Sequence, residues 1–147
     1  MTPQALAALH AAAFVHERPW SSDEFASLLN SDHVSLLTDE HSFALARTVA
    51  GESELLTLAV DPDHQRCGLG RKLTRAWLTA ARAQADVAFL EVAADNAGAH
   101  ALYTAEGFAE VGRRKGYYMR KNAAPADAIV MRRDLTLGHH GVLHPPT

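Results

Sequence analysis

The segment LLTLAVDPDHQRCGLGRKL, residues 55–73, decides the fold, because it joins a strand-like run to a helix through two glycines one residue apart. A helix N-terminus exposes unpaired backbone N–H groups at the positive end of its dipole, which favours anions, above all phosphates. Gly68 and Gly70 permit positive φ angles and a close ligand approach, and Arg66 and Arg71 add charged donors. The loop therefore suits a pyrophosphate, although a Gly-x-Gly spacing alone is more typical of a simple turn.

Two well-known phosphate-binding loops do not fit this segment. A P-loop requires Gly, four residues and then Gly-Lys-Ser/Thr, a string that the chain does not contain. A dinucleotide fingerprint has a third glycine where Leu73 stands, and its glycines follow the strand directly, whereas DPDHQRC intervenes here. Glu91, 21 residues after Gly70, matches the position of the ribose-binding acid of that motif. The two departures nevertheless exclude a Rossmann site.

The segments on either side of the loop predict a mixed α/β fold. Apolar residues at helical spacing follow the glycines, and a continuous apolar run typical of a buried strand comes next. Helices are expected at residues 3–16, 21–29, 69–84 and 96–107, and strands at 33–39, 42–50, 52–61, 87–93, 108–118 and 127–135. The strand, helix, strand order around the loop predicts a right-handed parallel crossover within an otherwise antiparallel sheet.

The composition is that of an ordinary globular protein, with 48% hydrophobic and 21% charged residues and no apolar stretch of membrane-spanning length. We expect one domain over residues 1–136 and a flexible tail at residues 137–147. The lack of a positively charged leader and the single cysteine, Cys67, predict a cytoplasmic protein. A net charge of -3 gives no general attraction to nucleic acid, so neither nucleic acid nor membrane is an expected partner.

Several motifs in this order resemble the GNAT superfamily of N-acetyltransferases. The strand ending in Val and the Gly loop are similar to the acetyl-CoA-binding segment of that family. The motifs PWS (19–21), LEV (90–92), DN (95–96), ALY (101–103), EGF (106–108) and RRKGYY (113–118) resemble the RimI-type ribosomal protein alanine N-acetyltransferases. The combination is far more specific than the loop alone. Over residues 3–135 the resemblance implies the GNAT fold, a mostly antiparallel mixed sheet flanked by helices with the parallel crossover at the acetyl-CoA site.

The resemblance also implies which residues hold acetyl-CoA, the co-substrate. The pantetheine arm is expected along the main chain of Leu58, Ala59 and Val60, whose side chains also suit the core. The pyrophosphate is expected on the loop residues Arg66, Cys67, Gly68, Leu69, Gly70 and Arg71, where Cys67 would contribute its N–H and not act as a nucleophile. Asn96 matches a cofactor contact and is equally plausible as a helix N-cap.

Two residues match the proton-transfer groups of the family. Acetyl transfer requires the amine to lose a proton and the departing thiolate to gain one. The resemblance implies Glu91 as the general base, directly or through water, and Tyr103 as the general acid, since an unperturbed phenol of pKa about 10 is protonated at neutral pH. The residues themselves leave alternatives open. Glu91 could be a salt-bridged strand residue facing solvent, and Tyr103 could belong to a packed helix face.

The implied function is transfer of an acetyl group to the N-terminal α-amine of a protein, with the alanine of a small-subunit ribosomal protein as the acceptor. The alternatives are an acetyltransferase of a small amine or antibiotic, and a non-catalytic acyl-CoA-binding module. Retention of Glu91 and Tyr103 argues against the module, and the PWS and GYY segments favour a peptide acceptor. Ala93 stands where the subfamily usually carries arginine, so any contact made by that arginine is expected to be missing.

Neither the histidines nor the basic cluster indicates a further ligand. The spacing of the nine histidines predicts no metal site, and His139, His140 and His144 fit a flexible tail that chelates only adventitiously. A run of basic residues near the last two strands is predicted to be a solvated hairpin face and not a contact to RNA or to the CoA 3′-phosphate. The run consists of Arg113, Arg114, Lys115, Arg120 and Lys121.

Overall fold

The computed structural model describes residues 1–14, 17–120 and 122–136. The elements are α1 (Pro3–Ala13), α2 (Ser22–Leu29), β1 (Val34–Thr38), β2 (Ser42–Val49), β3 (Glu52–Val60), the 3-10 helix η1 (Pro62–His64), α3 (Leu69–Ala81), β4 (Val87–Ala93), α4 (Ala97–Ala105), β5 (Ala109–Tyr118) and β6 (Ala126–Asp134). The predicted order is confirmed, and η1 is an addition to it. The expected flexible tail, residues 137–147, lies outside the described residues, as do residues 15 and 16 of the first predicted helix.

Helices α1 and α3 end earlier than predicted. α1 ends at Ala13 because Phe14 is its C-cap and donates its N–H to the carbonyl of His10. α3 ends at Ala81, three residues early, because Ala83 and Gln84 continue only as tight turns with bonds to residues three positions back. α2 starts as predicted, since Ser21 and Glu24 form both bonds of a capping box.

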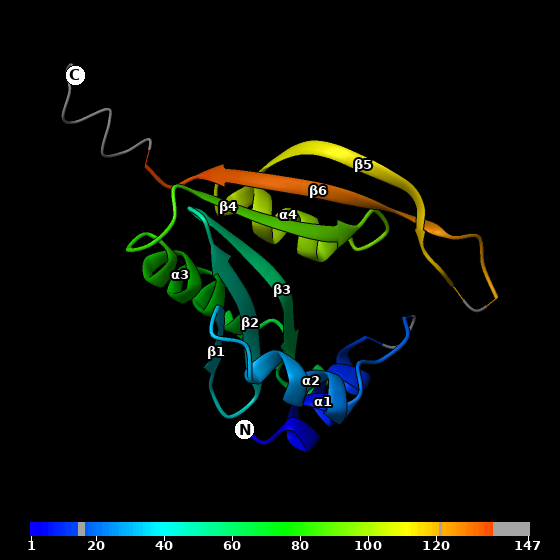
Figure 1. Cartoon of the computed structure of the whole chain (residues 1–147). Helices are drawn as coiled ribbons and strands as arrows, with labels where there is room; N and C mark the ends of the chain where they lie inside the picture. The colour runs from blue at the N-terminus through cyan, green and yellow to red at the C-terminus, as the bar shows by residue number, and fades with distance from the viewer. Residues whose placement is uncertain (15–16, 121, 137–147) are drawn as a thin grey trace, which may run out of the picture.

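Six strands form one sheet in the order β1-β2-β3-β4-β6-β5, which is antiparallel except for the parallel pair β3 and β4. The predicted parallel crossover is thus confirmed. Residues 52–55 of β3 pair with residues 87–90 of β4, and no pairing between these strands is found beyond Leu55 within the described chain. The two strands then diverge, as Figure 1 shows. The main chain of β3 from Leu56 to Val60 therefore keeps one side free of strand partners.

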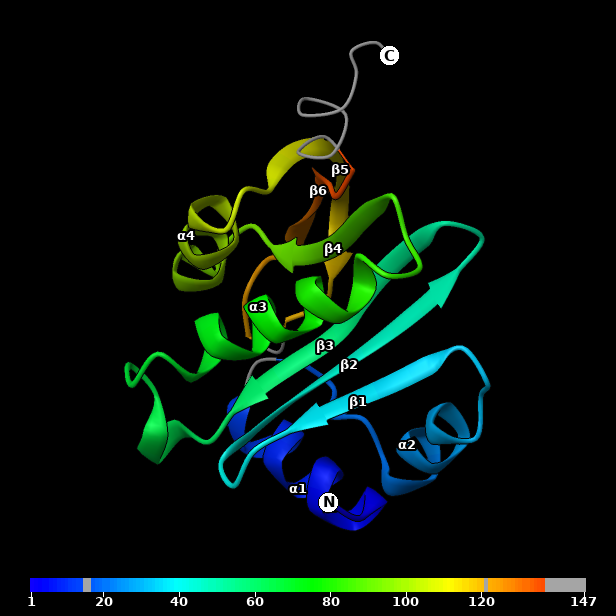
Figure 2. The same ribbon diagram turned by 90° about the vertical axis from the view of Figure 1, so that its left-hand side faces the viewer.

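The helices cover opposite faces of this sheet. Alternate residues of a strand point to opposite faces, and on β2 Ala44 belongs to one core cluster whereas Phe43 belongs to the other. The first cluster holds Trp77 of α3 together with side chains of β3, β4, α4 and β6. The second holds Leu6 of α1 and Phe25 of α2. In Figures 1 and 2, α3 accordingly lies on one side of β2 and β3, and α1 and α2 lie on the other.

Within the described residues, no helix has the length and apolar character needed to cross a membrane.

Candidate active site

The Gly loop forms the N-terminus of α3 through one left-handed glycine. Gly68 is the N-cap with φ 79° and provides no side-chain cap, so the first-turn N–H groups of α3 lack intrahelical acceptors. Of the two glycines that permit a positive φ, only Gly68 adopts one; Gly70 lies inside the helix, and the other left-handed residue of the loop is Arg66, with φ 66°. A Cβ at position 70 would lie 3.3 Å from Cδ2 of Leu102, a tight contact that requires this leucine side chain to shift slightly.

A pocket of about 710 Å³ opens over this loop and is called the Gly-loop pocket here. Most of the residues predicted to hold acetyl-CoA line it, namely Leu58, Val60, Arg66, Gly68, Leu69, Gly70, Arg71 and Asn96. Ala59 does not, because its side chain is buried in the core under α1. Cys67 is exposed and also does not line the pocket. If these two residues bind acetyl-CoA, they do so through main-chain atoms.

A second pocket of about 170 Å³ adjoins the first and contains Glu91, so we call it the Glu91 pocket. Residues from α1, the segment after it, β3, β4 and β5 line it, including His10, Glu17, Trp20 and Tyr118. The two pockets share Phe14, Leu58, Asn96, Ala99 and Tyr103. Tyr103 is the one shared residue with an acidic side-chain proton, and it lies where the two cavities meet.

Glu91 is both paired with a cation and part of the pocket lining. Its side chain is 22% exposed, and its Oε2 lies 3.2 Å from Nε of Arg114 on β5. The two groups form an ion pair but no hydrogen bond, so the buried Oε2 of Glu91 has no hydrogen-bond donor among the described residues. The salt bridge considered from the sequence therefore exists, although Glu91 also lines a pocket.

Tyr103 is likewise both packed and available to the pockets. It is 7% exposed, and its ring meets Phe108 edge-on at a centroid distance of 6.0 Å. Burial raises the pKa of Tyr103 far above the ordinary value of a phenol, because it disfavours the phenolate. The hydroxyl therefore stays protonated throughout the neutral and moderately alkaline range.

Asn96 acts as the N-cap of α4. Its Oδ1 accepts a hydrogen bond from the backbone N–H of Ala99 at 3.1 Å. This confirms the capping interpretation, and the position on the wall of both pockets leaves a cofactor contact open as well.

Sequence reasoning missed His10 at the wall of the Glu91 pocket. His10 is buried, and its Nδ1 accepts a hydrogen bond from the backbone N–H of Trp20 at 3.2 Å while its ring stacks on that indole. Burial, together with the positive charge of Arg18, lowers the pKa of His10 to about 4, so the ring is neutral at pH 7.

The prediction that Arg120 is solvated is wrong. Its side chain is 8% exposed, with Nη2 at 2.9 Å from Asp95 and Nη1 at 3.8 Å from Glu17. Its guanidinium also lies 5.6 Å from the ring centroid of Tyr118. Two acidic side chains and an aromatic face offset the cost of burying this charge.

Arg120 also borders a pocket of about 350 Å³ together with Ala93. A guanidinium is therefore present beside the position where the arginine usual in the subfamily is missing. The other described residues of the basic run agree better with the prediction. Arg113 and Arg114 are about half exposed and paired with acidic side chains, and Lys121 lies outside the described residues.

Comparison with known proteins identifies the class to which this fold and loop belong. The profile of the acetyltransferase (GNAT) family matches residues 7–108, and the chain belongs to this family. It is an acetyl-CoA-dependent N-acetyltransferase.

Within the family the chain is similar to the RimI-type enzymes. It is 39% identical over 140 residues to the N-alpha-acetyltransferase RimI of Mycobacterium tuberculosis, covering 89% of this chain and 85% of that protein. It is 36% identical over 130 residues to the [ribosomal protein bS18]-alanine N-acetyltransferase of Escherichia coli K12, covering 85% and 87%. The crystal structure of the ribosomal-protein-S18-alanine N-acetyltransferase from Escherichia coli superimposes with a TM-score of 0.80 at 35% identity, over 91% of this chain and 87% of the other.

Substitution at Gly70 tests where acetyl-CoA binds. A ligand that binds only the folded state raises Tm by mass action. We expect Gly70→Val to abolish the rise in Tm that acetyl-CoA gives the parent, because the new side chain occupies the tight space beside Leu102 at the pocket wall. Melting curves with and without acetyl-CoA and a calorimetric titration measure this.

The matched control for this experiment is Gly112→Ala on β5, where a Cβ would make ordinary contact with Val130 at 3.9 Å. This control should respond to acetyl-CoA as the parent does. Gly70→Ala provides the same comparison if the valine variant does not fold. Unchanged acetyl-CoA affinity in a folded Gly70 variant would contradict the assignment.

Proposed function

We propose that the protein transfers the acetyl group of acetyl-CoA to the N-terminal α-amine of a protein, the acceptor being the N-terminal alanine of a small-subunit ribosomal protein. The observation that carries this proposal is the meeting of two pockets at Tyr103, one over the Gly loop and one containing Glu91. The acceptor follows from the similarity to the Escherichia coli enzyme that acts on ribosomal protein bS18. An acceptor of this kind places the reaction in the cytoplasm.

In this proposal acetyl-CoA lies along β3 and the Gly loop. The pyrophosphate accepts hydrogen bonds from the N–H of Cys67 in the loop and from the first-turn N–H groups of α3, which begins at Leu69. The guanidinium groups of Arg66 and Arg71 add charge. The pantetheine arm pairs with the main chain of residues 58–60. Support for this placement comes from the divergence of β3 from β4 beyond Leu55, which leaves backbone groups of β3 without strand partners.

The acetyl group then lies at the junction of the two pockets, with the acceptor amine in the Glu91 pocket. The amine nitrogen attacks the thioester carbonyl and loses a proton to Glu91, directly or through a water molecule. A C–N bond forms and the C–S bond breaks. Tyr103 donates its phenolic proton to the departing thiolate, and its raised pKa means that this proton is present at neutral pH.

The small volume of the Glu91 pocket favours a protein N-terminus over an antibiotic. Pockets for drug-sized molecules enclose about 300–1,000 Å³, whereas the Glu91 pocket encloses about 170 Å³. A short N-terminal residue such as alanine presents its amine without a bulky side chain. The neutral ring of His10 and the indole of Trp20 provide an uncharged wall for such a residue.

Peptide acetylation tests this proposal. The expected substrates are peptides with a free N-terminal alanine, because an α-amine has a pKa of about 8 and is partly neutral at pH 7. A lysine amine has a pKa of about 10.4, so its neutral form at pH 7 is about 200-fold less abundant, a cost of roughly 3 kcal/mol. The same peptides with a blocked N-terminus and an internal lysine should therefore react at least about 100-fold more slowly. A preference for the blocked peptides would refute an α-amine acceptor.

A further inference from the structure

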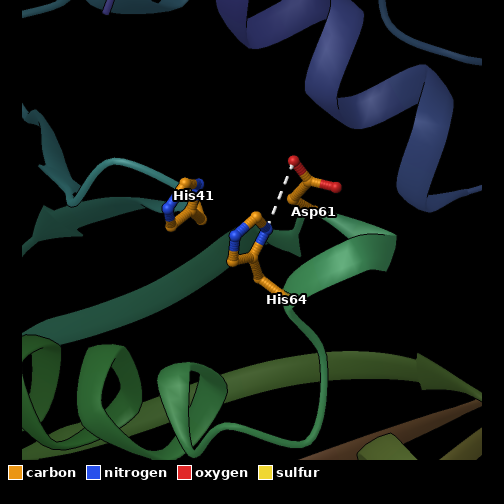
Figure 3. A group of neighbouring side chains, drawn as sticks. All are labelled: His41, Asp61 and His64. Carbon is orange, nitrogen blue, oxygen red and sulfur yellow. Dashed lines mark ion pairs between the residues drawn. The ribbon is translucent and has the colours of Figure 1, made fainter.

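A cluster of metal-ligating side chains lies outside the two pockets. His41 comes from the connection between β1 and β2, and Asp61 and His64 come from the segment that follows β3 (Figure 3). One nitrogen from each histidine and one oxygen from the aspartate lie within 4.8 Å of one another, and all three residues are half-buried. Figure 3 shows the His41 ring lying beside His64, with Asp61 on the other side of the His64 ring.

Backbone hydrogen bonds fix the two segments that carry this cluster. The N–H of Asp61 donates to the carbonyl of His41 at 2.8 Å, and the N–H of His64 donates to the carbonyl of Asp61 at 2.8 Å. The Asp61 side chain is also oriented, because Oδ1 accepts from the N–H of Asp63 at 3.0 Å as the cap of η1. This leaves Oδ2 at 3.6 Å from Nδ1 of His64. The donor atoms are thus brought together by main-chain structure, as a preorganised site requires.

One feature of the cluster is unfavourable without a cation. Nδ1 of His64 is buried and has no hydrogen-bond partner, which costs free energy for a polar atom. The rings of His41 and His64 lie nearly parallel at 7° with centroids 3.5 Å apart. The lone pair of an imidazole nitrogen lies in the plane of the ring, so one of the two half-buried rings must turn before both can bind the same ion. A cation bound by both rings and by Asp61 satisfies the buried nitrogen.

We propose that His41, Asp61 and His64 bind a divalent transition-metal ion, with Zn²⁺ as the best-matched ion. Imidazole nitrogen and carboxylate oxygen are ordinary Zn²⁺ ligands, and three protein ligands with a water molecule complete a tetrahedron. Two imidazoles disfavour Mg²⁺ and Ca²⁺, which prefer oxygen ligands. Ligand atoms of a tetrahedral Zn²⁺ lie about 3.3 Å apart, so binding requires the donors to approach by about 1.5 Å at most and one imidazole ring to turn out of the stack.

The position of the site gives the ion a structural consequence. It joins the connection between β1 and β2 to the segment that leads into the Gly loop, since His64 stands two residues before Arg66. A bound ion cross-links these segments and is expected to stabilise the folded protein. It takes no part in proton transfer, because none of its ligands lines the Gly-loop pocket or the Glu91 pocket. The proposed metal site therefore does not depend on which amine accepts the acetyl group.

The test is a calorimetric titration of the full chain with ZnCl₂. Because His139, His140 and His144 could bind the ion adventitiously, the reference protein carries alanine at these three positions. It should bind one Zn²⁺ per chain, and Zn²⁺ should raise its Tm relative to protein treated with a chelator. His41→Ala and His64→Ala should each weaken binding at least tenfold, since the loss of even an outer-shell partner of a metal typically costs about 10–100-fold.

Two further variants make the result decisive. Asp61→Asn keeps an oxygen that can cap η1 and removes the charge, so it should fold and bind Zn²⁺ more weakly. His33→Ala changes an exposed histidine outside the cluster and should bind as the reference does. No one-to-one binding to the reference, or binding that is unchanged in His41→Ala, His64→Ala and Asp61→Asn, would overturn the proposal.

Discussion

Glu91→Gln is expected to lower kcat by about 10²- to 10⁴-fold, the usual contribution of a positioned general base. Acetyl-CoA should bind this variant nearly as well as the parent, because Glu91 lines only the Glu91 pocket and not the Gly-loop pocket. The residual rate should rise with pH, since more of the amine is then neutral without help from a base. Steady-state kinetics across a pH series, with a parallel acetyl-CoA titration, provide the measurement.

Arg114→Gln is the matched control for this variant. It removes the cation 3.2 Å from Glu91 and leaves the carboxylate in place. If Glu91 served only as half of an ion pair, both variants would lose activity to a similar extent. The base assignment instead predicts a much smaller loss for Arg114→Gln. Nearly full kcat for Glu91→Gln across neutral pH would show that another group or water alone accepts the proton.

Tyr103→Phe is expected to reduce kcat to a similar extent, about 10²- to 10⁴-fold, because the thiolate then leaves without a proton donor. Phenylalanine keeps the ring that packs edge-on against Phe108, so the fold should persist. High pH should relieve this defect less than that of Glu91→Gln, since alkali supplies neutral amine but no acid. The parent should show no alkaline loss from Tyr103 between pH 7 and about 10, because burial holds the pKa of this phenol above its ordinary value.

Tyr118→Phe distinguishes this role from that of a second, half-buried phenol. Tyr118 lines the Glu91 pocket but not the Gly-loop pocket, and burial with the nearby carboxylates of Glu17 and Glu91 raises its pKa to about 12. Its loss should affect the KM of the acceptor more than kcat. A larger fall in kcat for Tyr118→Phe than for Tyr103→Phe would indicate that Tyr118, and not Tyr103, is the general acid.

The features that sequence predicted well are those with local signals. The capping box at Ser21 and Glu24 and the helical period after Gly70 depend on residues within a few positions of one another. The parallel crossover followed from element order alone. Even there, the tight contact that a side chain at position 70 would make is not local, because it involves Leu102, which lies in another helix.

The features that sequence missed depend on contacts between distant segments. Arg120 stands in a basic run typical of a solvated surface, yet its partner Asp95 lies 25 residues earlier. His10 lines the Glu91 pocket because α1 packs near β3, and nothing in the pattern of α1 fixes that position. In the same way, His41 is 23 residues from His64, a spacing typical of no metal motif, and only the pairing of neighbouring segments brings them together.

The most direct measurement of the proposed activity is mass spectrometry of the small-subunit ribosomal proteins from cells with and without this enzyme. We expect one protein with an N-terminal alanine to carry an acetyl group, a mass increase of about 42 Da, only when the enzyme is present. Glu91→Gln or Tyr103→Phe, supplied in place of the parent, should restore little of this modification. Identical N-terminal acetylation of every small-subunit protein in both kinds of cell would contradict the proposed acceptor.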